Sequence, residues 1–266
     1  STVALAKEQG FDVRVIAKSA FNHGGTRQWG VELLPDMDVI LFLTQDAVLA
    51  DASAIENLLA AFENPQVGTA YGRQLPHKNA GPIAAHARLF NYPAESQLRG
   101  MQDREVFGIK TVFTSNSFAA YRRSALIQVG GFPLHTIMNE DTFVAGKMLC
   151  AGWKIAYCAE ARVHHSHDYG FTDEFKRYLD IGVFHAQTTW LRQTFGGASG
   201  EGMRFVLSEL RYLLKFAPDY IPSAIIRTGL KWLGFKMGLT LVESLPMALR
   251  QCLSLHKSYW RLQRAE

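Results

Sequence analysis

The hydrophobic positions of the chain change repeatedly between the two-residue period of a strand and the roughly 3.6-residue period of a helix. Strand patterns occupy Asp12–Ala17, Asp38–Leu43, Val67–Arg73, Thr111–Tyr121 and Lys154–His165. Helical patterns lie before and between them, over Thr2–Gln9, Trp29–Leu34, Pro82–Tyr92 and Glu140–Ala151, with a further helix that is capped by Asp51 or Ser53 and reaches Phe62. Strands that alternate with helices predict an α/β fold, with a mostly parallel sheet between helices.

A glycine-rich break divides the chain into two regions. A long helix is expected over Glu174–Phe195, and four glycines follow it within the next seven residues. Beyond the break the spacing of apolar residues is again helical. We therefore expect a main α/β domain over residues 1–195 and a helical C-terminal region over residues 203–266.

The positive charge of the chain is concentrated in the C-terminal region. The whole chain has 28 Lys and Arg against 24 Asp and Glu, and a net charge of +4. Residues 203–266 alone hold 10 basic and 4 acidic residues, so the rest of the chain is slightly acidic. A nucleic-acid protein would carry a basic face on its main domain, so no nucleic-acid partner is expected.

The cations of the C-terminal region lie beside aromatic and leucine side chains at helical spacing. Helices of this kind can lie in the headgroup plane of an anionic membrane. The alternative is a set of ordinary amphipathic helices that pack on the main domain. No signal peptide and no apolar run of about 18 residues is visible, so we expect a cytoplasmic chain whose basic region meets an anionic surface.

Two polar clusters lie at the ends of predicted strands. Thr44-Gln45-Asp46 stands at the carboxyl end of an apolar strand, where α/β sheets bind ligands. Its carboxylate could hold a divalent cation against a phosphate, although one such Asp is often only a turn residue. His164-His165-Ser166-His167-Asp168 ends the last strand, with His165 and His167 on one side; it could bind a metal or be a polar loop.

Two more segments could contribute to a site. Asn139-Glu140-Asp141-Thr142 opens a helix, where acids are favoured by the helix dipole but where an Asp could also accept a proton from a hydroxyl. His23-Gly24-Gly25-Thr26-Arg27 is expected to be a loop able to wrap a phosphate. Neither segment identifies a reaction alone.

Four motifs occur in a fixed order along the chain: FLTQDAVL, SNSFAAYRRSALIQVGGFP, NED and AGWKIAYCAEARVHHSH. In this order they resemble glycosyltransferase family 2. Within that family the chain is most similar to bacterial rhamnosyltransferases that build O-antigen, and HGGTR, YGRQLPH and GVFHA contribute to this closer resemblance. The resemblance implies the nucleotide-diphospho-sugar transferase (A-type glycosyltransferase) fold and inverting transfer from a nucleotide sugar.

The resemblance assigns donor and metal contacts to individual residues. The family's Asp-x-Asp motif falls on Thr44-Gln45-Asp46, which implies donor contacts from Gln45 and Asp46 and a Mg²⁺ or Mn²⁺ ion on Asp46. Thr44 replaces the first Asp of the motif, which removes one carboxylate. His165 matches a histidine that serves some members as a further metal ligand, and Arg27 matches a contact to the donor diphosphate.

The catalytic pair of the family falls on Glu140 and Asp141, with Asp141 as the catalytic base. The implied donor is dTDP-L-rhamnose, and the implied acceptor is a lipid-linked glycan at the inner membrane. A galactofuranosyl- or other hexosyltransferase, or a catalytically impaired membrane-associated module, remains an alternative. The similarity starts at the helix that follows the family's first strand, so we expect this chain to have reduced activity.

Overall fold

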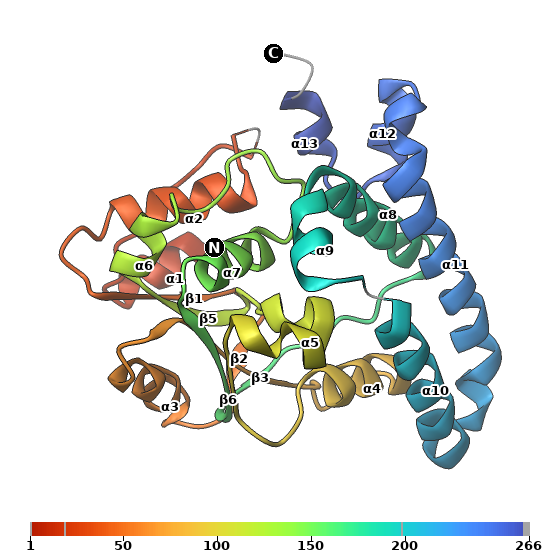
Figure 1. The fold of residues 1–266 in the computed structure, drawn as a ribbon, viewed down its shortest axis with the longest axis horizontal. Helices are drawn as coiled ribbons and strands as arrows, with labels where there is room; N and C mark the ends of the chain where they lie inside the picture. The colour runs from red at the N-terminus through yellow and green to blue at the C-terminus, as the bar shows by residue number, and fades with distance from the viewer. Residues whose placement is uncertain (1, 19, 198, 263–266) are drawn as a thin grey trace.

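The computed structural model describes residues 2–18, 20–197 and 199–262. Its centre is a six-stranded sheet within these residues (Figure 1). The strands are β1 (Val39–Leu43), β2 (Val48–Leu49), β3 (Val67–Leu75), β4 (Gln97–Arg99), β5 (Phe118–Arg122) and β6 (Lys154–His164). They lie in the order β1-β5-β3-β6-β2, and β4 pairs with β6 beside this path.

The sheet is mixed, so the expectation of a mostly parallel sheet was wrong. Among the described strands, β3 and β6 form the parallel pair, and β5 runs antiparallel to both β1 and β3. The short strands β2 and β4 are also antiparallel to β6. Hydrophobic periodicity indicates that a segment is a strand. It does not indicate whether the strand pairs parallel or antiparallel to its neighbour, because that direction depends on the connection between the two strands.

Helices surround the sheet and provide the C-terminal part of the molecule. They are α1 (Thr2–Glu8), α2 (His23–Glu32), α3 (Ala54–Leu59), α4 (Pro82–Asn91), α5 (Arg104–Phe107), α6 (Arg123–Gln128), α7 (Glu140–Cys150), α8 (Phe171–Gln187), α9 (Thr189–Phe195), α10 (Ser199–Phe216), α11 (Ile221–Thr240), α12 (Met247–Leu253) and α13 (Lys257–Leu262). Short 3₁₀ helices link several of them. No helix within the described residues is both long enough and apolar enough to cross a membrane.

The alternating side chains of β5 divide the core between the two faces of the sheet. Ala119 and Tyr121 belong to the larger cluster, which also takes in Met148 of α7 and Leu179 of α8. Phe118 and Ala120 belong to the smaller cluster, with Ala54 and Leu58 of α3. Figure 1 shows α3 and α7 on opposite sides of the sheet. Helices therefore cover both faces, as expected.

Three sequence expectations fail where local pattern was the only guide. Residues 11–17 form no strand, because no described strand pairs with them, and Val15 is 78% exposed. Residues 108–112 are a 3₁₀ helix, so the expected strand over Thr111–Tyr121 begins only at Phe118. The expected phosphate-wrapping loop at His23–Arg27 is the first part of α2, where the Asn22 side chain accepts the Gly25 N–H at 2.8 Å.

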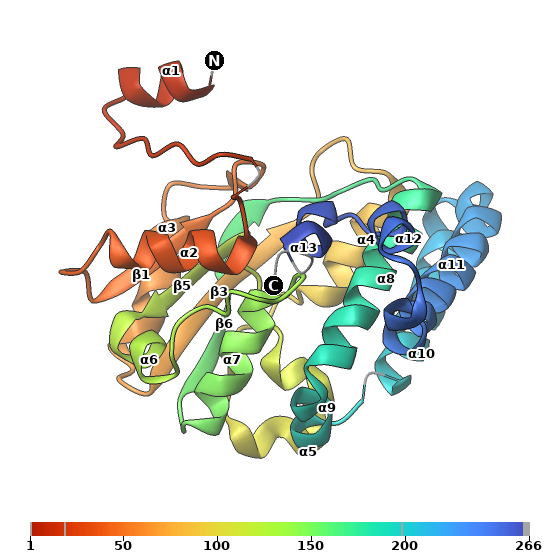
Figure 2. The ribbon, with the colours of Figure 1, turned by 90° about the horizontal axis from the view of Figure 1, so that it is seen from above.

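The C-terminal helices pack directly on the rest of the chain. Helix α11 lies along α8 (Figure 2), and α10 lies against α4 (Figure 1). Small residues allow the close approach, since a Cβ at Gly234 would lie 2.4 Å from the Phe175 carbonyl oxygen and one at Gly238 2.0 Å from that of Leu179. The expected long helix over Glu174–Phe195 is interrupted at Thr188, which separates α8 from α9.

Replacing Gly238 with alanine should lower the free energy of unfolding by about 2 kcal/mol, because the new methyl group cannot fit against the α8 backbone. The matched control is Gly229→Ala on the same helix, where nothing lies within 4 Å of the added Cβ. That variant should be about 0.5–1 kcal/mol more stable than the parent, since alanine favours helix. Urea unfolding of both variants measures the difference, and equal stability would contradict the α8–α11 contact.

Candidate functional site

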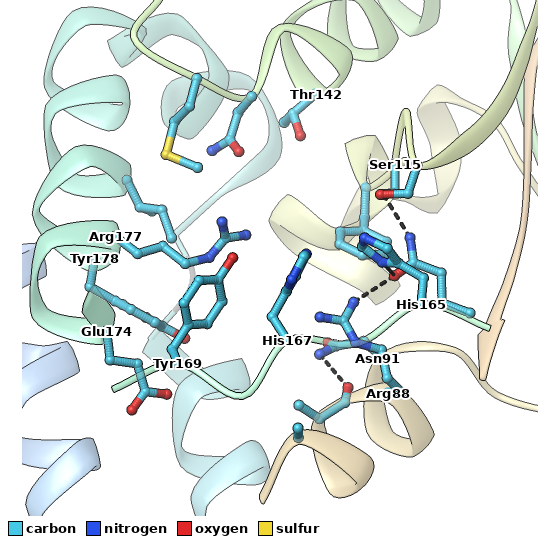
Figure 3. Close-up of a pocket in the computed structure, with 18 of the residues that line it drawn as sticks. Arg88, Asn91, Ser115, Thr142, His165, His167, Tyr169, Glu174, Arg177 and Tyr178 are labelled. Carbon is cyan, nitrogen blue, oxygen red and sulfur yellow. Dashed lines mark hydrogen bonds between the residues drawn. The ribbon is translucent and has the colours of Figure 1, made fainter. Parts of the chain in front are cut away.

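The predicted polar clusters meet at one cavity of about 620 Å³. Its walls come from the residues that follow β1 and β6, from the start of α7, and from α4, α8 and α11. Figure 3 shows Arg177 and Tyr178 of α8 on one side, Arg88 and Asn91 of α4 on the other, and His167 between them. The volume lies within the range of ligand pockets, roughly 300–1,000 Å³.

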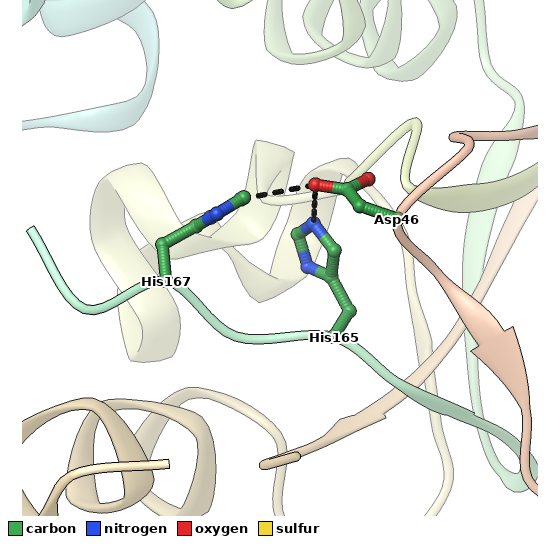
Figure 4. Close-up of side chains that lie close together, drawn as sticks. All are labelled: Asp46, His165 and His167. Atoms are coloured by element: carbon green, nitrogen blue, oxygen red, sulfur yellow. Dashed lines mark ion pairs between the residues drawn. The ribbon is translucent and has the colours of Figure 1, made fainter. Parts of the chain in front are cut away.

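A carboxylate and two imidazoles converge on one point of this cavity (Figure 4). The Asp46 Oδ2 lies 3.4 Å from the His165 Nε2 and 3.5 Å from the His167 Nε2. One ligand atom from each residue lies within 4.8 Å of the other two, which suits a single metal ion. Asp46 follows β1 while the histidines follow β6, so the fold joins segments about 120 residues apart in the sequence.

The ring of His165 is held in place from behind. Its Nδ1 donates to the Gln74 Oε1 at 2.9 Å, and the same oxygen accepts an N–H of Arg88 at 2.6 Å. The Gln74 amide nitrogen in turn donates to the Ser115 hydroxyl at 2.9 Å. Because the Nδ1 carries the proton, the Nε2 presents its lone pair to the cavity, as in metal-binding histidines. Burial, and then the charge of Arg88, lowers the pKa of His165 to about 4, so the ring is neutral.

A second polar group forms at the start of α7. Asp141 accepts the backbone N–H of Asn116 at 3.1 Å and that of Thr142 at 2.7 Å. Burial and then the neighbouring charge of Glu140 raise the pKa of Asp141 to about 6. The residue before this pair, Asn139, has a φ of 57°, a left-handed conformation that Asn tolerates better than most residues. The turn directs Asp141 into the cavity, where it can accept a proton near neutral pH.

Glu140 is paired rather than free. Its Oε1 lies 2.8 Å from the Arg27 Nη1 and accepts the Asn116 side-chain amide at 3.0 Å. The Tyr121 hydroxyl donates to the other end of that amide at 2.7 Å, which fixes its orientation. Glu140 is 6% exposed. Its contacts fit a residue that positions Arg27 and Asn116 better than one that exchanges protons.

Of the other predicted residues, some line the cavity and one lies outside it. Arg27 of α2 lines the cavity while it pairs with Glu140, and Thr44 also lines it. Gln45 is exposed and lies outside the cavity lining, so the structure does not bring this predicted donor contact to the site. The family resemblance assigned the metal role to His165 and not to His167, although the strand alternation had placed the two on one side.

Two cations of the basic C-terminal region turn inward. Arg227 and Lys231 of α11 line the cavity and pair with Glu174 of α8 at 2.7 and 3.0 Å. Arg227 also donates to the Tyr169 carbonyl oxygen at 2.7 Å. The C-terminal region therefore contributes one wall of the site. Arg88 and Arg177, which the motifs did not indicate, add two more cations to the cavity.

The chain is similar to two curated proteins over most of its length. The chain is 53% identical over 260 residues to the O-antigen chain rhamnosyltransferase RfbN of Salmonella typhimurium, covering 97% of this chain and 82% of that protein. It is 51% identical to the O-antigen chain rhamnosyltransferase WbaN of Salmonella anatum, over 94% of this chain and 79% of that protein.

A solved mannosyltransferase from Pyrobaculum calidifontis, in complex with GDP-Man and Mn²⁺, matches 91% of this chain and 63% of its own chain, with 14% identity and a TM-score of 0.42. That score is too low to add to the assignment. The family model for glycosyl transferase family group 2 matches residues 39–250, which include Asp46, Asp141, His165 and His167. The match confirms the resemblance found in the motifs and the A-type fold it implies. The chain belongs to glycosyl transferase family group 2, and it is a glycosyltransferase.

Proposed function

We propose that this chain transfers L-rhamnose from dTDP-L-rhamnose to a lipid-linked glycan in O-antigen synthesis, with inversion at the anomeric carbon. The observation that carries the chemistry is one cavity that combines a metal-type cluster at Asp46, His165 and His167 with a buried carboxylate, Asp141. The two Salmonella rhamnosyltransferases, each more than half identical to this chain, support the sugar and the pathway.

The reaction follows from these positions in a single step. Asp141 takes the proton of an acceptor hydroxyl, and the hydroxyl oxygen forms a bond to the anomeric carbon of the donor. The bond from that carbon to the diphosphate oxygen breaks, and its electron pair leaves with dTDP. Glu140 keeps Arg27 and the Asn116 amide in place beside the base. No covalent intermediate with the enzyme forms.

The cluster fits a divalent cation by its ligand chemistry. Asp46 provides an oxygen, and His165 and His167 each provide a neutral nitrogen. Imidazole nitrogens suit transition metals, whereas Mg²⁺ prefers oxygen alone, so the donor set favours Mn²⁺. When bound, the ion offsets negative charge on the leaving diphosphate. Arg27 and Arg177 line the same cavity and add positive charge for the phosphates.

A thermal-shift panel tests the proposal directly. The chain is heated with dTDP, UDP or GDP, each with and without Mn²⁺. A ligand that binds only the folded state stabilises it by about 2.7 kcal/mol at a hundredfold excess over its Kd. We expect the largest shift with dTDP and Mn²⁺ together. A larger shift with UDP would favour the galactofuranosyl or hexosyl alternative, and no shift with any nucleotide would contradict the proposal.

The acceptor requires contact with a membrane, and we place that contact on the outer face of α10 and α11. Its apolar members are all exposed: Met203, Leu207, Leu214, Phe216, Ile225, Ile226, Trp232 and Leu233. Exposed cations stand among them at Arg204, Arg211, Lys215 and Lys236. An apolar face flanked by cations fits the headgroup region of an anionic bilayer. This surface would hold the enzyme at the cytoplasmic face of the inner membrane.

Replacing Trp232 with glutamate should weaken binding to phosphatidylglycerol-containing vesicles about tenfold, because the side chain is 64% exposed at the centre of this face. Co-sedimentation with the vesicles measures the change. The control is Trp29→Glu on α2, a tryptophan that is 38% exposed but lies away from α10 and α11. Equal loss in both variants, or no loss in either, would contradict the assigned face.

A further inference from the structure

The segment formed by residues 254–260 is anchored to α8 by a buried carboxylate. Asp180 of α8 has no exposed surface, and its Oδ2 accepts the Leu255 N–H and the His256 Nδ1–H, both at 2.9 Å. A buried carboxylate is unfavourable unless donors reach it, so these two donors offset the burial of Asp180. The Ser254 hydroxyl, also buried, accepts the His256 backbone N–H at 2.9 Å. The main chain and the ring of His256 are therefore both fixed, although 76 positions separate it from Asp180.

The same segment is packed into the core at its other end. Trp260 is 1% exposed and belongs to the larger core cluster, which covers one face of the sheet. The Gln187 amide, at the end of α8, donates to the Tyr259 hydroxyl at 2.7 Å. Hydrogen bonds and packing thus hold both ends of the segment, so a side chain that it presents to the main cavity keeps its place.

The anchored His256 ring lies against the start of α2. It meets the His23 ring edge to face, with centroids 5.4 Å apart, and both residues line the main cavity. Aromatic rings in this arrangement attract each other beyond the effect of the area that they bury. Because His23 is the first residue of α2, the contact ties the beginning of that helix to a segment near the other end of the chain (Figure 2).

Arg27 lies one turn after His23 on α2 and is held against it. Its Nη1 donates to the His23 carbonyl oxygen at 3.1 Å and lies 3.5 Å from the His23 Nδ1. Burial lowers the pKa of His23, so the neutral ring can accept from the guanidinium instead of repelling it. The same Nη1 lies 2.8 Å from the Glu140 Oε1. A chain of contacts therefore runs from Asp180 through His256 and His23 to Arg27.

We propose that His256 is a positioning residue for the transfer reaction, which acts through His23 to hold the Arg27 guanidinium at the donor diphosphate. The inference rests on the proposed function, because it takes Arg27 as a contact to that diphosphate. Arginine has a long side chain with many rotamers, so a guanidinium that is fixed in advance loses less entropy when a phosphate binds. Glu140 holds the end of the Arg27 side chain, and His256 holds the turn of α2 from which that side chain extends.

A double-mutant cycle between His256 and Arg27 tests this inference. The probe is dTDP in the presence of Mn²⁺, and isothermal titration measures its affinity. His256→Asn is preferred to His256→Ala, because the asparagine amide can still donate to the buried Asp180 carboxylate. Arg27→Gln likewise keeps a donor for the buried Glu140. The control is His135→Asn, at an exposed histidine outside the cavity.

We expect His256→Asn to weaken dTDP binding about fivefold, since it removes the ring contact with His23. Arg27→Gln should weaken binding about 30-fold, because it removes a charged donor to the diphosphate. If the His256 ring acts through the guanidinium, the double variant should bind dTDP within about twofold of Arg27→Gln alone. A merely structural role of His256 would not produce this coupling. His135→Asn should bind dTDP as the parent does.

Two results would overturn the inference while the proposed function stands. If His256→Asn binds dTDP as tightly as the parent, the ring contact does not position Arg27. If the losses in the two single variants multiply in the double variant, His256 acts on the site independently of Arg27. A third result, a parent chain that does not bind dTDP at all, would remove the proposed diphosphate site and the inference with it.

Discussion

Replacing Asp141 with asparagine should lower the rate of sugar transfer about 1,000-fold while dTDP affinity stays within twofold. Asparagine keeps the size of the side chain, and its single oxygen can still accept one of the two backbone N–H groups, from Asn116 and Thr142, that Asp141 accepts on separate oxygens. It cannot accept a proton, and loss of a positioned base costs roughly 10²–10⁴ in rate. Because Asp141 is assigned to the acceptor hydroxyl and not to the donor, the substitution should lower kcat and leave nucleotide binding intact.

The pKa of Asp141 adds a pH dependence to this prediction. Burial and the charge of Glu140 raise that pKa to about 6, and only the deprotonated form can act as a base. Turnover should therefore rise with pH through about 6 and level off above it. In Asp141→Asn the residual rate should lose this inflection.

Transfer is measured with dTDP-L-rhamnose and a lipid-linked acceptor between pH 5 and 8, and dTDP affinity by titration. Asp173→Asn is the control, since Asp173 is an exposed acid in the first turn of α8, outside the cavity. Wild-type turnover in Asp141→Asn would remove Asp141 as the base. A parallel loss of dTDP affinity would instead indicate a role in donor binding.

The sequence predicted strands and helices best where local pattern and final packing agree. The apolar run Asp38–Leu43 became β1, and the alternation of Lys154–His165 became β6. Residues 11–17 show where local pattern is not enough. Their alternation is as regular as that of Lys154–His165, but no described strand pairs with them. The direction of pairing also escaped prediction, since it depends on the path of the chain between strands rather than on any strand itself.

The site could be predicted residue by residue but not as a network. The motifs indicated Asp46, His165 and Asp141, and all three line the main cavity. Gln74 supports His165 from 91 positions earlier in the chain, on a different strand, and nothing in the local sequence around either residue reports that contact. Such contacts exist only once β3 and β6 are neighbours in the sheet.

The orientation of α11 explains why two cations of the C-terminal region line the cavity instead of the surface. Arg227 and Lys231 belong to the same basic pattern as Lys236, yet the first two pair with Glu174 and only Lys236 is exposed. The face of α11 that turns inward is set by Gly234 and Gly238, which let the helix approach α8. A charge count over the C-terminal region therefore overstates the cations available to a membrane, and the structure reduces them to those on the outer face.

Removing a side chain from the Asp46 cluster should abolish Mn²⁺ binding and lower transfer about 1,000-fold. Asp46→Ala removes the one carboxylate of the cluster, and His167→Ala removes one of its two imidazoles. With Thr44 in place of a second acid, the cluster has no further carboxylate ligand among the residues that the structure describes. Each substitution should therefore lower metal affinity and activity by more than the 10- to 100-fold that is typical when a residue supporting a metal ligand is replaced.

Neighbouring histidines at the end of β6 allow a matched comparison. His164 stands next to His165, but its Nδ1 bonds the Pro76 carbonyl oxygen at 2.9 Å and its ring lies outside the cluster. His164→Ala should thus keep Mn²⁺ affinity within about threefold, while His167→Ala loses it. Titration of the free Mn²⁺ signal by electron paramagnetic resonance gives both affinities. If Asp46→Ala fails to bind Mn²⁺ but His167→Ala binds it normally, the ion is held by Asp46 and His165 alone, and His167 is left to contact the phosphates.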